Sequence, residues 1–405
     1  MSQGNGWETV PLGDIITPAK RAVTVEDDRT YQQVTVRIKG RGLTSRGFAE
    51  GLAIGTKKQY EVCTGDLLVS KIDARNGGLG LVPSDLDEAI VTSDFPAYEV
   101  DAARCLAQYV DLYVRRPMFW EECLLVSEGS TNRVRLVPEQ FLALEIEIPS
   151  LATQEKIVGA VAAIDRLARA RERELRATQH VLRAAREHLL ATGGAWEDLP
   201  EGWTASALGE LAEVRSGITK GRKTKGELRA VPFIRAANVQ DGWLDLSEIK
   251  TLDVTDNEVD RFRLESGDVL MTEGGNAEHV GRGWLWEGAV PEAVAQNHVF
   301  RVRVADTETL DPRFLAYAIG SEPAREYCLG CSKKTTNLAS INKTQVTELR
   351  VPVPPLAEQL RIVRQLDSLR SAGERMQGVL TSTEGFRAAL IEDLVTGIRQ
   401  PPSAS

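Results

Sequence analysis

Two short segments carry most of the clustered positive charge, and their residue types suit contacts with phosphate groups. Residues 31–60 contain six basic residues against one acid, Glu50, and residues 215–235 contain seven against one acid, Glu227. Both segments are rich in glycine, which allows a backbone to approach a phosphate chain closely. A charge run is most often a solvated face, but its recurrence in two segments favours nucleic-acid binding.

Further polar residues have the side chains that distinguish bases in the major groove. Residues 70–78 and 272–276 place Lys, Arg, Asn and Glu on glycine turns. Arg pairs with guanine and Asn with adenine, each through two hydrogen bonds. The cluster at 296–298 is interpreted either as a base contact or as a cap on the adjoining strand. The predicted DNA-binding residues are Arg37, Lys39, Arg41, Arg46, Lys71, Arg75, Asn76, Arg222, Lys223, Lys225, Arg235, Gly274, Gly275, Asn276, Arg282, Lys333 and Lys334.

The sequence offers little for catalysis. Residues 221–227 resemble a phosphate-binding loop but lack the Lys-Ser/Thr that would bind phosphate and metal. Cys328 and Cys331 have no second pair to complete a zinc site, and we interpret them as buried. Asp66 and Asp268 each follow glycine and precede an apolar triplet, which indicates a turn entering a buried strand. We predict no catalytic residue, no metal site and no cofactor in this chain.

Composition is typical of a globular protein. Of 405 residues 42% are hydrophobic and 26% are charged, with a formal net charge of −9. No apolar run approaches 18 residues, and no signal peptide is recognised, so we expect a cytoplasmic protein. The five cysteines do not suggest a disulfide framework. Acidic residues concentrate at 85–88 and 253–260, away from the basic segments, and we expect those faces to point away from nucleic acid.

The basic segments belong to two copies of one sequence pattern. Residues 7–14 recur at 203–210, and Gly-Asp followed by an apolar triplet occurs at 65–69 and 267–271. Thr-Asn at 131–132 recurs at 336–337, residues 148–154 recur at 353–359, and residues 156–158 recur at 361–363. Five matches in the same order indicate a duplication of about 200 residues. In each copy strands precede a helix (near 102–114 and 311–319), followed by a strand that stops at proline.

A long helix closes each copy. Steps of four and three residues from Ile157 and from Ile362 meet mostly apolar side chains over four heptads. This period indicates a coiled coil rather than a helix on a globular core. Two unrelated amphipathic helices are the alternative, but the matching registers favour mutual pairing. The predicted seam residues are Ile157, Val161, Ile164, Leu175, Leu182, Leu189, Ile362, Leu366, Leu369, Met376, Leu380, Leu390 and Leu394.

We therefore predict an α+β protein with two globular domains of mixed α and β structure. The two long helices join them as an antiparallel coiled coil, and the internal repeat has pseudo-two-fold symmetry. The predicted domains are residues 1–150 and 196–353, the predicted helices are 151–195 and 354–398, and a disordered tail is expected at 399–405. An antiparallel pair would hold the two domains apart as a rigid spacer, whereas a parallel pair would place both at one end.

The chain resembles the specificity (S) subunit of type I restriction–modification systems. The residues that carry the resemblance are 199–203 with 208–210, 70–76, 273–276 with 296–301, 335–338, and 354–359 with 361–363. It covers nearly the whole chain, and the tandem order is more specific than any single motif. The first copy departs at residues 149–153, where Pro149-Ser150 replaces a doubled proline and Thr153 replaces a glutamate.

The resemblance implies two target-recognition domains, each binding one half of a bipartite sequence in double-stranded DNA. The helices would set the spacer and dock two methyltransferase (M) subunits, which use S-adenosylmethionine; restriction (R) subunits that use ATP and Mg would join them. The chain itself would be a non-catalytic subunit in phage defence.

Two alternatives remain. One is a coiled-coil scaffold whose globular domains bind proteins without specific DNA contact. The other is a divergent nuclease whose site is not recognised in the sequence.

Overall fold

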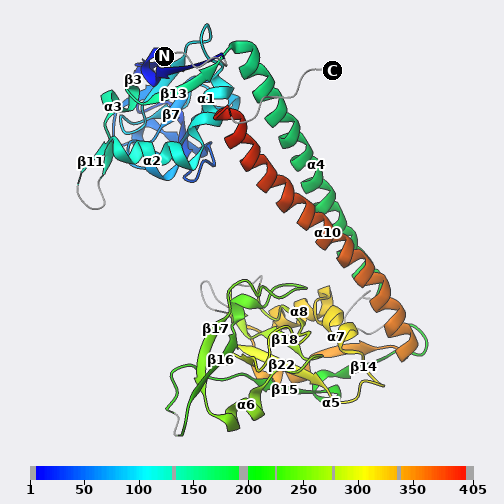
Figure 1. The fold of residues 1–405 in the computed structure, drawn as a ribbon. Coiled ribbons are helices and arrows are strands. Elements are labelled where there is room, and N and C mark those ends of the chain that lie inside the picture. Colours follow the sequence, from blue (N-terminus) through cyan, green and yellow to red (C-terminus); the bar gives the residue numbers. More distant parts are fainter. Residues whose placement is uncertain are drawn as a thin grey trace. The chain divides into compact units, whose positions relative to one another are not determined.

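The computed structural model describes residues 6–129, 134–190, 199–223, 226–275, 279–334 and 339–397. The chain divides into two compact units. The first unit comprises residues 1–172 and 378–405, and the second comprises residues 173–377. Each unit therefore contains a globular part together with a part of both long helices (Figure 1).

The first unit is built on three sheets. A two-stranded sheet pairs β1 (Trp7–Pro11) with β13 (Glu145–Pro149). A four-stranded sheet has the order β2 (Ile16–Ala19), β10 (Ala97–Val100), β7 (Leu67–Val69) and β8 (Leu79–Leu81). A five-stranded sheet has the order β3 (Ala22–Thr24), β6 (Lys58–Glu61), β9 (Ile90–Val91), β4 (Thr30–Val36) and β5 (Leu43–Glu50). Helices α1 (Ala107–Val114), α2 (Pro117–Leu125) and α3 (Pro138–Leu142) and a hairpin of β11 (Ser127–Glu128) and β12 (Arg135–Leu136) complete it.

The second unit repeats this plan. β14 (Thr204–Ala207) pairs with β25 (Arg350–Val353), and a four-stranded sheet has the order β15 (Ala212–Ser216), β22 (Val299–Val304), β18 (Val269–Thr272) and β20 (Gly283–Leu285). Two three-stranded sheets have the orders β17 (Lys250–Val254), β16 (Arg229–Ile234), β21 (Val294–Ala295), and β19 (Gly274–Gly275), β24 (Ala339–Ser340), β23 (Lys333–Lys334). Its helices are α5 (Leu208–Leu211), α6 (Asp256–Phe262), α7 (Pro312–Ile319), α8 (Glu322–Cys331) and α9 (Lys343–Glu348). The predicted tandem repeat is confirmed.

Local signals for helix starts and turns are also confirmed. The side chain of Asp311 accepts hydrogen bonds from the backbone N–H groups of Arg313 (2.8 Å) and Phe314 (3.0 Å), as an N-cap should. Asp66 and Asp268 cap the turns that enter the buried strands β7 and β18, where they accept from backbone N–H groups at 2.8 and 2.7 Å. Their charges are offset by Arg21, in the link between β2 and β3, and by Arg303 of β22, so both carboxylates are structural.

The long helices are α4 (Leu151–Leu189) and α10 (Leu356–Val395), and they pair antiparallel within each unit (Figure 1). In the first unit, Ile157 near the start of α4 packs in one cluster with Leu394 near the end of α10. In the second unit, Leu189 near the end of α4 packs in one cluster with Ile362 near the start of α10. All thirteen predicted seam residues are buried or half-buried. None of the helices in the described part of the chain has the length and apolar character that a bilayer crossing needs.

One buried glutamine in each unit fastens the long helix to the globular part. Gln154 accepts a hydrogen bond from the backbone N–H of Leu106 (2.8 Å), which is the N-cap residue of α1. Its amide nitrogen donates to the carbonyls of Arg104 (3.2 Å) and Pro149 (2.9 Å). The Gln154 side chain therefore links α4, α1 and β13 at a point where it is 0% exposed.

Gln359 makes the same three bonds in the second unit. It accepts from the N–H of Asp311 (2.8 Å) and donates to the carbonyls of Thr309 (2.9 Å) and Pro354 (2.8 Å). It is also 0% exposed. Because buried backbone groups need partners, these bonds fix how each long helix leaves its globular part.

Replacing Gln359 with methionine should destabilise the second unit. The change keeps the length of the side chain but leaves one N–H and two carbonyls buried without partners, which costs at least about 2 kcal/mol. Urea denaturation of the full chain should show a lower midpoint than for the control Gln377→Met, which changes an exposed glutamine of the same helix. Equal midpoints for the two variants would contradict this role of Gln359.

Candidate nucleic-acid interface

In the first unit, two of the predicted DNA-binding segments lie against each other. The turn between β4 and β5 carries Arg37, Lys39 and Arg41, all exposed. The N–H of Lys39 donates to the carbonyl of Asn76 at 2.6 Å, and the N–H of Gly40 donates to the carbonyl of Gly77 at 3.0 Å. The structure thus brings the basic hairpin turn next to the turn that holds Arg75 and Asn76.

Both turns pack against the ring of one tryptophan, Trp120. Gly77 has φ +76°, and a Cβ there would lie 2.6 Å from the ring of Trp120 in α2. A Cβ on Gly40 would lie 3.1 Å from the same ring. Glycine is required at Gly77 both by the left-handed backbone and by this contact. Packing against Trp120 therefore fixes the backbone of the two turns that carry these polar side chains.

The basic side chains of this hairpin are available for a ligand. Lys39, Arg41 and Arg46 make no ion pair with any residue that the structure describes. The guanidinium of Arg37 donates to the hydroxyl of Thr44, at 3.3 Å. Asn76 is exposed, and its amide nitrogen donates to Asp73 at 3.1 Å, which fixes the orientation of the amide. These are the properties expected of residues that contact phosphates and bases.

In the second unit, the basic segment is largely neutralised by acidic residues. Arg222 donates two bonds of 2.6 Å to Glu258, and these bonds lower the pKa of Glu258 to about 2. Arg229 pairs with Asp256 at 2.7 Å and also with Glu292, and Arg235 pairs with Glu248 at 3.2 Å.

This corrects the expectation that the acidic residues 253–260 lie on a face apart from the basic segment. The reason is strand pairing. β17 lies antiparallel beside β16, with Arg229 opposite Val254, so α6 and its acids follow directly at the end of the basic strand. Of the remaining residues predicted in this segment, Lys223 is exposed, and Lys225 lies outside the described residues.

A second group of predicted DNA-binding residues in this unit lies at the three-stranded sheet of β19, β24 and β23. β19 contributes Gly274 and Gly275, and β23 contributes Lys333; both strands pair with β24. The structure thus brings these three predicted residues together. Asn276 and the side chain of Lys334 lie outside the described residues. Arg282 is half-buried, and burial lowers its pKa; it donates to the carbonyl of Ala236 at 3.4 Å.

Three polar side chains that contact one another in a row lie next to this sheet. The ring Nδ1 of His298 lies 2.7 Å from Oε2 of Glu273, and the amide nitrogen of Asn297 lies 3.4 Å from the other ring nitrogen. Of the 296–298 cluster, Gln296 bonds the N–H of Ala236 at 3.3 Å and so acts as a cap. Asn297 and His298 do not make this bond, and they stay candidates for the base contact that the sequence suggested.

Equivalent positions in the two units carry different side chains. The N–H of Lys71 donates to the carbonyl of Asp94 at 2.9 Å, and the N–H of Glu273 donates to the carbonyl of His298 at 2.9 Å. The backbone bond is the same, but Lys71 and Asp94 are replaced by Glu273 and His298. The two units therefore present surfaces of different chemistry on the same backbone fold.

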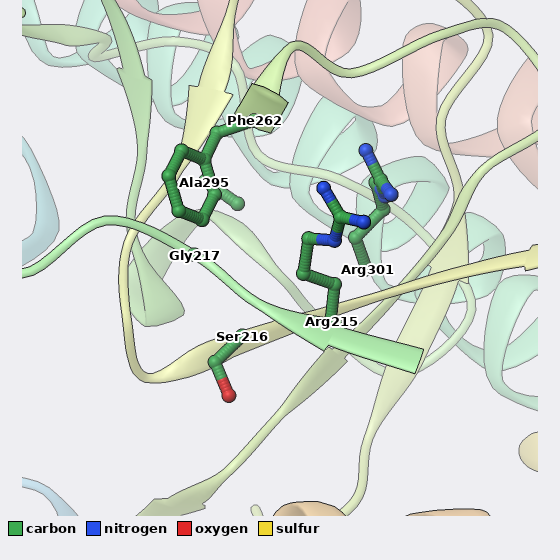
Figure 2. Close-up of a pocket in the computed structure, with 6 residues that line it drawn as sticks. All are labelled: Arg215, Ser216, Gly217, Phe262, Ala295 and Arg301. Atoms are coloured by element: carbon green, nitrogen blue, oxygen red, sulfur yellow. The ribbon is translucent and has the colours of Figure 1, made fainter. Parts of the chain in front are cut away.

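Arginines also fill the face of the β15–β22 strand pair. Arg215 and Arg301 lie opposite each other, and Figure 2 shows their guanidinium groups side by side. Both bond Glu213, the contact from Arg301 being 2.6 Å. Burial lowers the pKa of Arg301, which is 5% exposed.

Comparisons with known proteins give a consistent result. The family model of the type I restriction modification DNA specificity domain matches residues 4–177 and again residues 200–379. The chain is 25% identical over 279 residues to the EcoKI specificity subunit of Escherichia coli K12. It is 26% identical over 271 residues to the StySPI specificity subunit of Salmonella potsdam. Each alignment covers 64% of this chain but only 58% of the relative, so the chain aligns with little more than half of these proteins.

A solved structure shows the same fold. A chain from work on complex assembly and conformational transition of the type I R-M system has a TM-score of 0.65 at 18% identity. The match covers 98% of this chain and 99% of that one.

The ion pair between Arg222 and Glu258 predicts a pH dependence. Because the folded state lowers the pKa of Glu258 from 4.5 to about 2, the pair stabilises the fold fully above pH 4.5. The stability of the wild type relative to Glu258→Gln should therefore shrink as the pH falls from 4.5 towards 2, measured by urea denaturation. Glu201→Gln, which changes an exposed glutamate, should show no such trend. If the difference in the free energy of unfolding between wild type and Glu258→Gln stays constant down to pH 2, the ion pair does not stabilise the fold as proposed.

Proposed function

The chain belongs to the type I restriction modification DNA specificity family, and on that premise we propose that it selects the DNA sequence for a restriction–modification complex. The observation that carries this proposal is the tandem match of the family model, which falls on two units of the same fold. DNA is a polyanion, and the exposed hairpin of the first unit offers positive charge for its phosphates.

We propose further that each unit binds one half of a bipartite target in double-stranded DNA. The different side chains at equivalent positions support this, since Lys71 in one unit and Glu273 in the other have opposite charges at the same position of the fold. The two half-sites should accordingly differ in sequence. Contacts of Lys39 and Arg41 with DNA phosphates would position the first unit. Asn76 is a candidate for contact with a base.

The paired helices are proposed to set the spacer between the half-sites and to dock two methyltransferase subunits. Four large apolar side chains on α4 and α10 support docking, because they are 48–54% exposed: Leu167, Val181, Val379 and Phe386. The buried core of a protein interface is rich in apolar side chains. The reactions are assigned to partners: S-adenosylmethionine would be bound by the methyltransferase subunits, and ATP and Mg by any restriction subunits.

Neutralising the hairpin should weaken DNA binding and its dependence on salt. In the variant Lys39→Gln/Arg41→Gln/Arg46→Gln, each lost phosphate contact should reduce the slope of log K against log salt by about 0.9. Fluorescence anisotropy measures the binding of duplex DNA to the assembled complex. A series from about 50 to about 300 mM salt would give this slope. The control Arg29→Gln removes an exposed arginine that pairs with Glu26 at the other end of β4. A slope equal to that of the control would count against the proposal.

Shortening both helices together should change the preferred spacer. Residues 174–180 of α4 and 372–378 of α10 form one heptad in each helix, contain none of the four exposed apolar side chains, and can be deleted together with the seam kept in register. Seven residues of helix span about 10 Å, which is about three base pairs of DNA. Methylation of targets with varied spacers should therefore shift to shorter ones. Full activity on the original spacer would refute the role of the helices as a ruler.

A further inference from the structure

The first unit contains a cleft that the proposed DNA contacts do not explain. Its volume is about 300 Å³, and it lies between the β2–β10 strand pair, β6 and α3. Clefts that hold small molecules start at about this size. A single small ligand or one nucleotide is therefore the scale of occupant that the cleft admits.

The walls combine flat apolar surface with positive charge. Tyr60 and Phe95 supply aromatic surface, and three prolines supply more. Lys20 and Lys71 line the cleft against one carboxylate, that of Glu139. Neither lysine makes an ion pair with any described residue. The cleft therefore suits a ligand that is planar in one part and anionic in another.

The hydroxyl of Tyr98 provides a second observation. Tyr98 lines the cleft, and its hydroxyl makes no hydrogen bond with any residue that the structure describes. The residue is 1% exposed, but this hydroxyl is not among the fully buried polar atoms that lack a partner, so it keeps access to the open space of the cleft. Burial raises the pKa of Tyr98 to about 12, so the hydroxyl keeps its proton and can donate to a ligand in the cleft.

The second unit fills the equivalent space with its own side chains. Ala19 and Ala97 face each other across β2 and β10, whereas Arg215 and Arg301 occupy the same register across β15 and β22. Figure 2 shows the guanidinium groups of these arginines side by side, and the pocket that they line has a volume of about 0 Å³ for a water-sized molecule. The open cleft is thus produced by small residues in the first unit at positions where the fold can accommodate large ones.

We propose that this cleft binds one nucleotide. Its base would lie against the aromatic and proline walls, and Lys20 and Lys71 would hold its phosphate. Aromatic walls and lysines are the groups with which proteins hold unstacked nucleotides. The choice of a nucleotide among planar anions rests on the proposed DNA function. A free mononucleotide and a nucleotide extruded from a duplex offer the same chemistry to the cleft.

Titration of the full chain with the four deoxynucleoside 5′-monophosphates by isothermal calorimetry tests the proposal. At least one should bind, and the double variant Lys20→Gln/Lys71→Gln should weaken it at least about tenfold, since two charge-assisted contacts are lost. Ala19→Arg, which introduces the residue of the second unit, should abolish binding. Lys156→Gln removes an exposed lysine of the same unit outside the cleft and should bind as the wild type does. Absence of binding for all four nucleotides, or equal binding by the lysine variants, would overturn the proposal.

Addition of sheared duplex DNA to the bound mononucleotide separates the two sources. Displacement from the wild-type chain supports a nucleotide that DNA itself inserts, and simultaneous binding supports a free nucleotide. Duplex binding is followed in the same samples. If duplex DNA binds and no mononucleotide does, the cleft proposal fails while the proposed function stands.

Discussion

The arrangement of each unit depends on one buried glutamine at the start of a long helix. Gln154 and Gln359 each connect the helix to the strand that precedes it and to the cap of a second helix. A buried amide with all three bonds made is stable, whereas a reoriented helix would leave backbone groups unpaired. The direction of the helix and the position of the sheets within a unit are therefore coupled, so the coiled-coil seam and the polar surface keep a defined relation.

On this common plan the two units carry different chemistry. Lys71 corresponds to Glu273, and the alanine pair of the first unit corresponds to the arginine pair of the second. Because the backbone bonds are conserved between units, these exchanges change the surface without changing the fold. A duplicated scaffold of this kind suits a protein that must bind two different segments of one ligand.

Much of the fold could be predicted because its signals are local. The seam from Ile157 follows from periodicity, and the turn at Asp268 follows from a glycine before an apolar triplet. The neutralisation of Arg222 by Glu258, which lies 36 residues away in the sequence, could not be predicted, since it depends on the pairing of β16 with β17, which brings the segments flanking these strands together. The cleft was likewise hidden, because its shape depends on the register that places Ala19 opposite Ala97. Which residues contact bases depends on the DNA as well as on the protein.

The central claim is that this chain directs a modifying complex to DNA through two unlike surfaces. Mapping of methylated adenines in genomic DNA, from cells with and without the gene, tests it most directly. The account predicts methylation of a two-part motif with a fixed unspecified interval and dissimilar halves, and this methylation should vanish when the gene is removed. Identical methylation in both kinds of cell, or loss of a single uninterrupted motif, would contradict it.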